Sequence, residues 1–239
     1  MSTSYLLTQS GFAILTIIFY GLLLNELNKA LRSSTLPDER KKKIFKGSLL
    51  VILCWMIATT ILSLSGILSD FSSFPPRLFI VLIIPLITTI WIITRKVTGE
   101  ILQHIPAVTL IRLQIFRVFV EILLWSLFIQ NLLPVQMTFE GRNFDVLSGL
   151  TAPLVAWLYH HHKVSKTVVI VWNFICLGLL INIVVIAILS MPTPLRVFLN
   201  EPANTIVAKF PIVWLPALLV PLAYGLHFLS LKQLFQKGD

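Results

Sequence analysis

The sequence predicts an all-α protein: a polytopic membrane protein built as a bundle of seven transmembrane helices, with the N-terminus outside and the C-terminus in the cytoplasm. Hydrophobic residues make up 56% of the chain and charged residues only 12%, which excludes a soluble domain with an ordinary polar surface. Apolar runs recur along the chain at roughly the 20-residue length that a helix needs to cross a hydrocarbon core of about 30 Å. Lysines and arginines gather beside alternate runs, as they do in membrane proteins of fixed orientation.

The expected spans take up most of the 239 residues, so residues 1–239 are predicted to form a single transmembrane domain. The spans cover residues 5–27, 47–68, 78–94, 110–133, 146–159, 167–189 and 211–231. The first apolar run is long and has no basic segment before it, so we interpret it as a span and not as a cleaved signal peptide. Cys54 and Cys176 both lie inside apolar runs, which does not indicate a loop disulfide.

The predicted orientation comes from the basic residues. The connection after the first span holds seven of them: Lys29, Arg32, Arg40, Lys41, Lys42, Lys43 and Lys46. By the positive-inside rule this connection is cytoplasmic, and only four of the 19 basic residues then fall in outer connections. This topology signal is sufficient to explain the net charge of +9, so membrane lipids and not nucleic acid are the expected partners. A polybasic connection can also bind anionic lipid.

The segment 110–133 differs from the other spans. It is apolar enough to cross a bilayer but carries Gln114, Arg117 and Glu121, which helical spacing places on one face. A carboxylate near the middle of a membrane costs about 2.5–3.5 kcal/mol on insertion scales, so Glu121 must face protein or water and find a partner. Since Arg117 and Glu121 are four residues apart, we expect them to pair on their own helix.

Two interpretations of this pair are open. It can be a structural bridge that neutralises two buried charges and fixes helix packing. It can instead be a site for a ligand, a proton or an ion, in which Arg117 keeps Glu121 ionised or releases it when a substrate carboxylate competes. Ionisable residues inside membrane spans are functional by default, which favours the second interpretation.

Three further residues are candidates for the same site. Asp145 stands at the start of the fifth span, where helix capping and the macrodipole explain an acidic residue, but it can also share an outward-facing cavity with Glu121. Tyr224 and His227 lie on one face of the last span. Haem or metal binding by His227 needs a second histidine at matching depth, for which His160 is the nearest candidate. No cofactor is predicted, because a hydrogen-bonded packing role explains His227 better.

Three further expectations concern asparagines, prolines and a glycine within the predicted spans. Asn173 and Asn182 are nine residues apart and point to nearly opposite faces, so at most one of them can reach the site. Pro216 and Pro221 remove backbone donors from the last span, and neighbouring groups must bond to the freed carbonyls. Gly149 permits a close approach between helices.

Several stretches of the chain carry a resemblance to known sequences. The segments QIFRVFVEILLW and FEGRNFDVLSGLTAP, followed by VWNFICLGLLINIV and FPIVWLPALLVPLAYGLH, resemble a group of uncharacterised bacterial integral membrane proteins with seven helices. The resemblance covers roughly the second half of the chain. It implies a multi-pass protein of the bacterial inner (plasma) membrane, and no activity is attached to that group.

Three functions are compatible with these features. The leading hypothesis is binding or transport of a small molecule or ion, with Glu121 as the ionisable centre, Arg117 as its partner, and Gln114 and Asp145 as supporting contacts. The first alternative is a non-catalytic subunit or sensor with a structural Arg–Glu pair, which docks a membrane protein partner or a second copy of itself. The second is a membrane enzyme acting on a lipid-borne substrate. An enzyme is less favoured, because the sequence contains no phosphate loop, nucleophile elbow, zinc-helix motif or CxxC pair.

Overall fold

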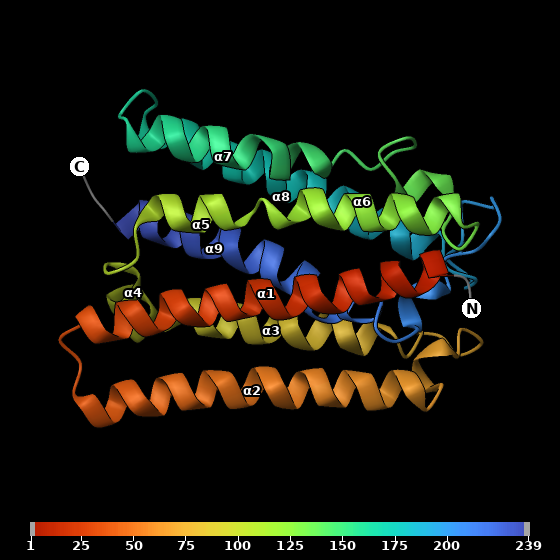
Figure 1. The fold of residues 1–239 in the computed structure, drawn as a ribbon, viewed down its shortest axis with the longest axis horizontal. Coiled ribbons are helices and arrows are strands. Elements are labelled where there is room, and N and C mark those ends of the chain that lie inside the picture. The colour runs from red at the N-terminus through yellow and green to blue at the C-terminus, as the bar shows by residue number, and fades with distance from the viewer. Residues whose placement is uncertain (1–2, 237–239) are drawn as a thin grey trace.

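The two N-terminal helices form a long antiparallel hairpin, with the second helix at one edge of the bundle and the first packed against the other helices (Figure 1). The computed structural model describes residues 3–236, in which α1 covers Thr3–Ser33 and α2 covers Asp38–Leu64. Two acidic residues in the first turn of α2 suit the positive end of the helix dipole. The hairpin is longer than predicted, since most of the expected basic connection is helical.

The remaining helices run back and forth along the same axis, so that α1 begins and α9 ends at opposite ends of the bundle (Figure 1). They are α3 (Phe79–Thr94), α4 (Lys96–Leu102), α5 (Ala107–Leu113), α6 (Phe116–Ile129), α7 (Val146–His160), α8 (Lys166–Leu189), the π-helical segment η4 (Leu215–Leu219) and α9 (Val220–Gln236). The connections contain short 3₁₀ turns: η1 (Ile67–Ser69), η2 (Val135–Met137) and η3 (Ile206–Ala208). No strand occurs in residues 3–236, so the all-α prediction is confirmed.

Several of these helices have the length and composition of membrane spans. Four are long and apolar enough to cross a membrane: α1, α2, α8 and the segment Leu215–Gln236. A fifth results if α3 and α4, which are bent by 76°, count as one span. α7 is apolar but shorter, with 15 residues. The helices are therefore compatible with a multi-pass membrane protein, while the number of seven spans stays a prediction.

The polar span 110–133 is not one continuous helix, contrary to the prediction. α5 and α6 follow the same line along the bundle (Figure 1) but are separated by Gln114 and Ile115. The N–H groups of Gln114 and Arg117 bond to carbonyls three residues back, at Ile111 and Gln114, each at 3.1 Å, which is the tighter 3₁₀ pattern. The break rotates α6 relative to α5, so helical spacing across it does not predict how Gln114 lies relative to Arg117 and Glu121.

The prolines of the last span loosen its backbone as predicted. η4 is a π-helical turn, and Pro221 just after it lacks the N–H that would bond to the carbonyl of Ala217 in a regular helix. The indole Nε1 of Trp55 on α2 donates to that carbonyl at 2.9 Å. The Tyr20 hydroxyl on α1 donates to the next carbonyl, that of Leu218, at 3.0 Å. Neighbouring helices thus bond to the irregular segment, which is the condition for such backbone inside a membrane.

Trp55→Phe is expected to lower the free energy of unfolding by roughly 1 kcal/mol, because the variant keeps an aromatic ring but leaves the carbonyl of Ala217 without its donor. Thermal unfolding of the purified protein in detergent measures the effect. Trp91→Phe on α3 is the control, since Trp91 is 56% exposed. An equal loss in both variants would show that ring size, and not the hydrogen bond, accounts for the change.

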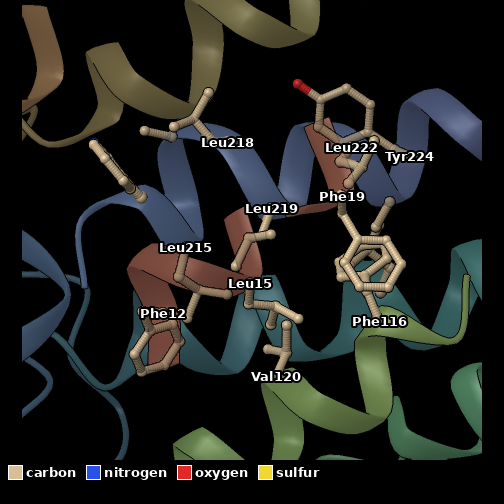
Figure 2. Close-up of a cluster of buried hydrophobic side chains, with 14 of the residues drawn as sticks. Phe12, Leu15, Phe19, Phe116, Val120, Leu215, Leu218, Leu219, Leu222 and Tyr224 are labelled. Carbon is tan, nitrogen blue, oxygen red and sulfur yellow. The ribbon is translucent and has the colours of Figure 1, made fainter. Parts of the chain in front are cut away.

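Buried side chains of α1, α6, η4 and α9 meet in the centre of the bundle (Figure 2). Phe19 of α1 lies 5.3 Å from Phe116 of α6, measured between ring centroids. Further members of this cluster are Phe12, Leu15, Val120, Leu215, Leu218, Leu219 and Leu222. Close packing of such side chains holds helices together in lipid, where no hydrophobic force acts between them. The cluster fixes α6, and with it Arg117 and Glu121, against the irregular part of the last span.

Candidate functional site

Arg117 on α6 is buried and forms a bidentate ion pair with Asp145, the residue directly before α7. Its Nε donates to Asp145 Oδ2 at 2.7 Å, and its Nη2 donates to the other carboxylate oxygen. Such bidentate pairs are among the stronger charge-assisted hydrogen bonds in proteins. The sequence predicts Glu121 as the partner of Arg117, and this pairing is wrong: Glu121 forms no salt bridge among residues 3–236.

Two local features bring Asp145 to Arg117. Asn143 Oδ1 accepts the backbone N–H of Asp145 at 3.0 Å, which fixes the turn before α7. α6 and α7 also cross closely at Gly149, where an added Cβ would lie 2.8 Å from the backbone nitrogen of Val118. The predicted role of Gly149 in close helix approach is therefore confirmed, and this approach holds the start of α7 beside Arg117.

His227 on α9 and Asn173 on α8 extend the network from Arg117. The ring Nε2 of His227 lies 2.8 Å from Arg117 Nη1, and its Nδ1 lies 2.8 Å from Asn173 Oδ1. Because a guanidinium group only donates, Nε2 accepts, and Nδ1 carries the hydrogen that bonds to Asn173. Asn173 in turn donates to the Ser230 hydroxyl at 3.2 Å. Asn182 instead donates to the backbone of the loop before α7, so only one of the two asparagines reaches the network, as predicted.

Glu121, one turn after Arg117 on α6, lies in a different environment. It is 2% exposed, and its two carboxylate oxygens lie 2.7 and 2.6 Å from a single atom, Asn143 Nδ2. Asn143 thus bonds to both acidic residues. Its amide nitrogen donates to the Glu121 carboxylate, and its amide oxygen accepts the backbone N–H of Asp145. Asn143 is not among the residues that the sequence predicts for the site, because an asparagine in a connection has no helical periodicity that marks it as buried.

A cavity of about 70 Å³ lies beside these residues, between α6, α8 and the η4–α9 segment. Its wall is mostly apolar, and its polar members are Arg117, Glu121, Asp145 and Asn204. Asn204 is fully buried, and its Oδ1 has no hydrogen-bond partner among the described residues. The volume is sufficient for a few water molecules or one small ion. The structure therefore brings Glu121 and Asp145 to one cavity, whose wall also includes Asn204.

The other predicted site residues do not line this cavity. Gln114 Nε2 donates to the carbonyl of Ala223 at 3.1 Å, which ties the break between α5 and α6 to α9. Tyr224 packs in the apolar core, 5.8 Å from Phe228 between ring centroids. His160 is exposed at the last residue of α7, whereas His227 is fully buried. In residues 3–236 no group of three or more His, Cys, Asp and Glu side chains is arranged to hold a metal ion.

The polar cluster lies in a part of the chain that matches a known sequence family. Residues 74–235 match the family described as Domain of unknown function (DUF8737), which contains α3 to α8 and nearly all of α9 but not the α1–α2 hairpin. Neither the curated proteins nor the solved structures contain a match to the chain. The family description names no source and no activity, so it does not support the resemblance to bacterial seven-helix proteins. Since the match covers more than half of the 239 residues, the chain belongs to this family of domains of unknown function.

Proposed function

We propose that this protein binds a proton or a small cation in the cavity beside Glu121 and carries it across the membrane. The observation that supports the proposal is the charge of the cluster that lines the cavity. Arg117 and Asp145 neutralise each other, whereas Glu121 forms no salt bridge within residues 3–236 and its carboxylate bonds to the neutral amide of Asn143. An unpaired carboxylate inside a membrane protein is unfavourable, and a bound proton or cation removes its charge.

The chemistry of the cavity wall favours a small, positively charged ligand. Glu121 and Asn204 both line the cavity and both carry side-chain oxygen acceptors, which are the groups that hard cations bind. The guanidinium of Arg117 already donates to Asp145 and His227, so it offers little to an anion. A cavity of about 70 Å³ suits an ion with a few waters better than a larger solute.

Irregular backbone borders the cavity on two sides. The 3₁₀ break lies directly before Arg117, and η4 contributes Leu215, Pro216 and Leu219 to the wall. Secondary transporters place broken helices at their binding sites, where unwound backbone lines the ion pathway. We therefore propose these two irregular segments as the moving elements of a transport cycle.

We further propose seven membrane spans, with α3–α4 and α5–α6 each counted as one broken span and α7 as a short one. The distribution of basic residues supports this arrangement. The α1–α2 connection, α4, the α7–α8 connection and the end of α9 share one end of the bundle (Figure 1). Because these segments hold most of the basic residues, the positive-inside rule makes this end cytoplasmic and the start of α1 external. The resemblance of the second half to bacterial proteins points to the bacterial inner membrane.

Glu121→Gln is the variant that tests transport. The full chain is reconstituted into liposomes that contain a dye for H⁺, Na⁺ or K⁺, and a gradient of that ion is imposed. We expect the wild type to carry at least one of these ions and Glu121→Gln to abolish the flux, because glutamine keeps an acceptor for Asn143 but removes the charge. Glu140→Gln is the control, since Glu140 is exposed and bonds to Trp125. Equal flux in Glu121→Gln and the wild type, or no flux of any of the three ions, would contradict the proposal.

A structural role is the second candidate function, and the burial of Arg117 favours it. Arg117 is 1% exposed and is held by Asp145 and His227, as expected for a residue that locks helices together. The chain would then be a membrane subunit or sensor, and neither the wild type nor Glu121→Gln would carry an ion in the liposome assay. The melting temperature of Glu121→Gln in detergent should stay close to that of the wild type, because the amide oxygen of glutamine still accepts from Asn143, so a lost flux would report on transport and not on unfolding.

A further inference from the structure

A groove with a volume of about 300 Å³ lies between the end of α1 and the start of α2. Its charged members are four basic side chains and one acidic side chain: Arg32, Lys41, Lys42, Lys46 and Asp38. Lys41 pairs with Asp38 at 3.5 Å, whereas Arg32, Lys42 and Lys46 form no salt bridge within residues 3–236. The groove therefore presents positive charges that no neighbouring carboxylate neutralises.

An exposed apolar stripe continues from the groove along α2. Lys42 and Lys46 lie one turn apart on one face of this helix. Leu50, Leu53 and Ile57 follow on the same face, and they are 62%, 46% and 59% exposed. One face of α2 thus carries basic side chains near the N-terminal end of the helix and exposed apolar side chains in the turns that follow. This order of groups complements a phospholipid, in which a charged phosphate is joined to apolar acyl chains.

We propose that this groove binds the headgroup of an anionic phospholipid, with the phosphate held by Arg32, Lys42 and Lys46 and an acyl chain lying along α2. The position of the groove supports this, because α1 and α2 are both candidate spans and the groove lies where they join. Basic residues beside membrane spans attract anionic lipids. A free phosphate would use the cations but leave the apolar stripe uncovered. The proposal does not depend on transport at Glu121.

Two double variants of the full chain, matched in charge, test the proposal. Lys42→Gln with Lys46→Gln removes two cations from the groove, while Arg40→Gln with Lys43→Gln removes two cations from the same helix outside it. Native mass spectrometry of the detergent-purified protein counts bound phosphatidylglycerol, with phosphatidylcholine and inorganic phosphate as comparison ligands. We expect the wild type and the outer variant to retain phosphatidylglycerol. The groove variant should bind it roughly 25-fold more weakly, since each basic residue near the surface contributes about fivefold.

Three outcomes would overturn the proposal. Equal weakening in both double variants would show a diffuse attraction to the whole basic helix. Equal binding of phosphatidylcholine would show that the groove does not select negative headgroups. Displacement of phosphatidylglycerol by equimolar inorganic phosphate would assign the groove to a free anion. Both variants change exposed side chains, so their melting temperatures should match the wild type, and none of these outcomes affects the ion flux expected of Glu121.

Discussion

Asp145→Asn is expected to lower the free energy of unfolding by about 3–5 kcal/mol, because the variant leaves a buried charge without its counter-charge. Asparagine keeps the size of the side chain but removes the charge that neutralises Arg117. Arg117 is 1% exposed, so bulk solvent does not screen the charge that the lost carboxylate leaves unpaired. Thermal unfolding and titration with sodium dodecyl sulfate, both on the purified protein in detergent, measure the loss.

Two comparisons isolate the contribution of this ion pair. Arg117→Met combined with Asp145→Asn should recover a large part of the loss, because no unpaired charge then remains at this position. Asp70→Asn is the surface comparison: hydrogen bonds from Ser72 hold the pKa of Asp70 below its ordinary value, and solvent screens its pair with Arg77. We expect a much smaller change there. If Asp145→Asn is as mild as Asp70→Asn, the buried pair does not stabilise the bundle.

Gly149→Ala is expected to lower the free energy of unfolding by about 1–3 kcal/mol, the usual range for overpacking at a close contact. The added Cβ would lie 2.8 Å from both the backbone nitrogen and the Cγ2 of Val118, so α6 and α7 must move apart. Their separation draws Asp145 away from Arg117, and any ion flux should fall together with the stability. The same unfolding experiments and the liposome assay measure the two effects.

Gly178→Ala on α8 is the matched control for this prediction. Nothing lies within 4 Å of a Cβ added at Gly178, so the change is sterically free. Alanine also favours the helix over glycine by about 1 kcal/mol in water, and the variant should be as stable as the wild type or more stable. A similar loss at Gly149 and Gly178 would mean that the close contact with Val118 does not account for the effect.

The sequence by itself determined the structural class and the position of most helices. Long apolar runs with few charges predict an all-α chain, because inside lipid a helix satisfies its own backbone hydrogen bonds. The same apolar background made Arg117, Glu121, Asp145 and His227 visible as candidates, since ionisable residues are rare in such runs. All four are buried in the structure. Ionisable side chains within long apolar runs are expected to face the interior of the bundle, and a single sequence shows both the runs and the ionisable residues.

Only the tertiary structure decided which of these residues meet. Helical spacing offers Arg117 a partner on its own helix, Glu121, but the crossing of α6 and α7 at Gly149 brings Asp145 from α7 to Arg117. Arg117 and Asp145 are 28 residues apart in the chain, and contacts at that separation leave no periodic signal in a single sequence. Arg117 therefore pairs with Asp145 and not with Glu121 as predicted. Glu121 forms no salt bridge within residues 3–236. This redistribution of charge is set by helix packing, and the proposal that the cavity binds a proton or a cation rests on it.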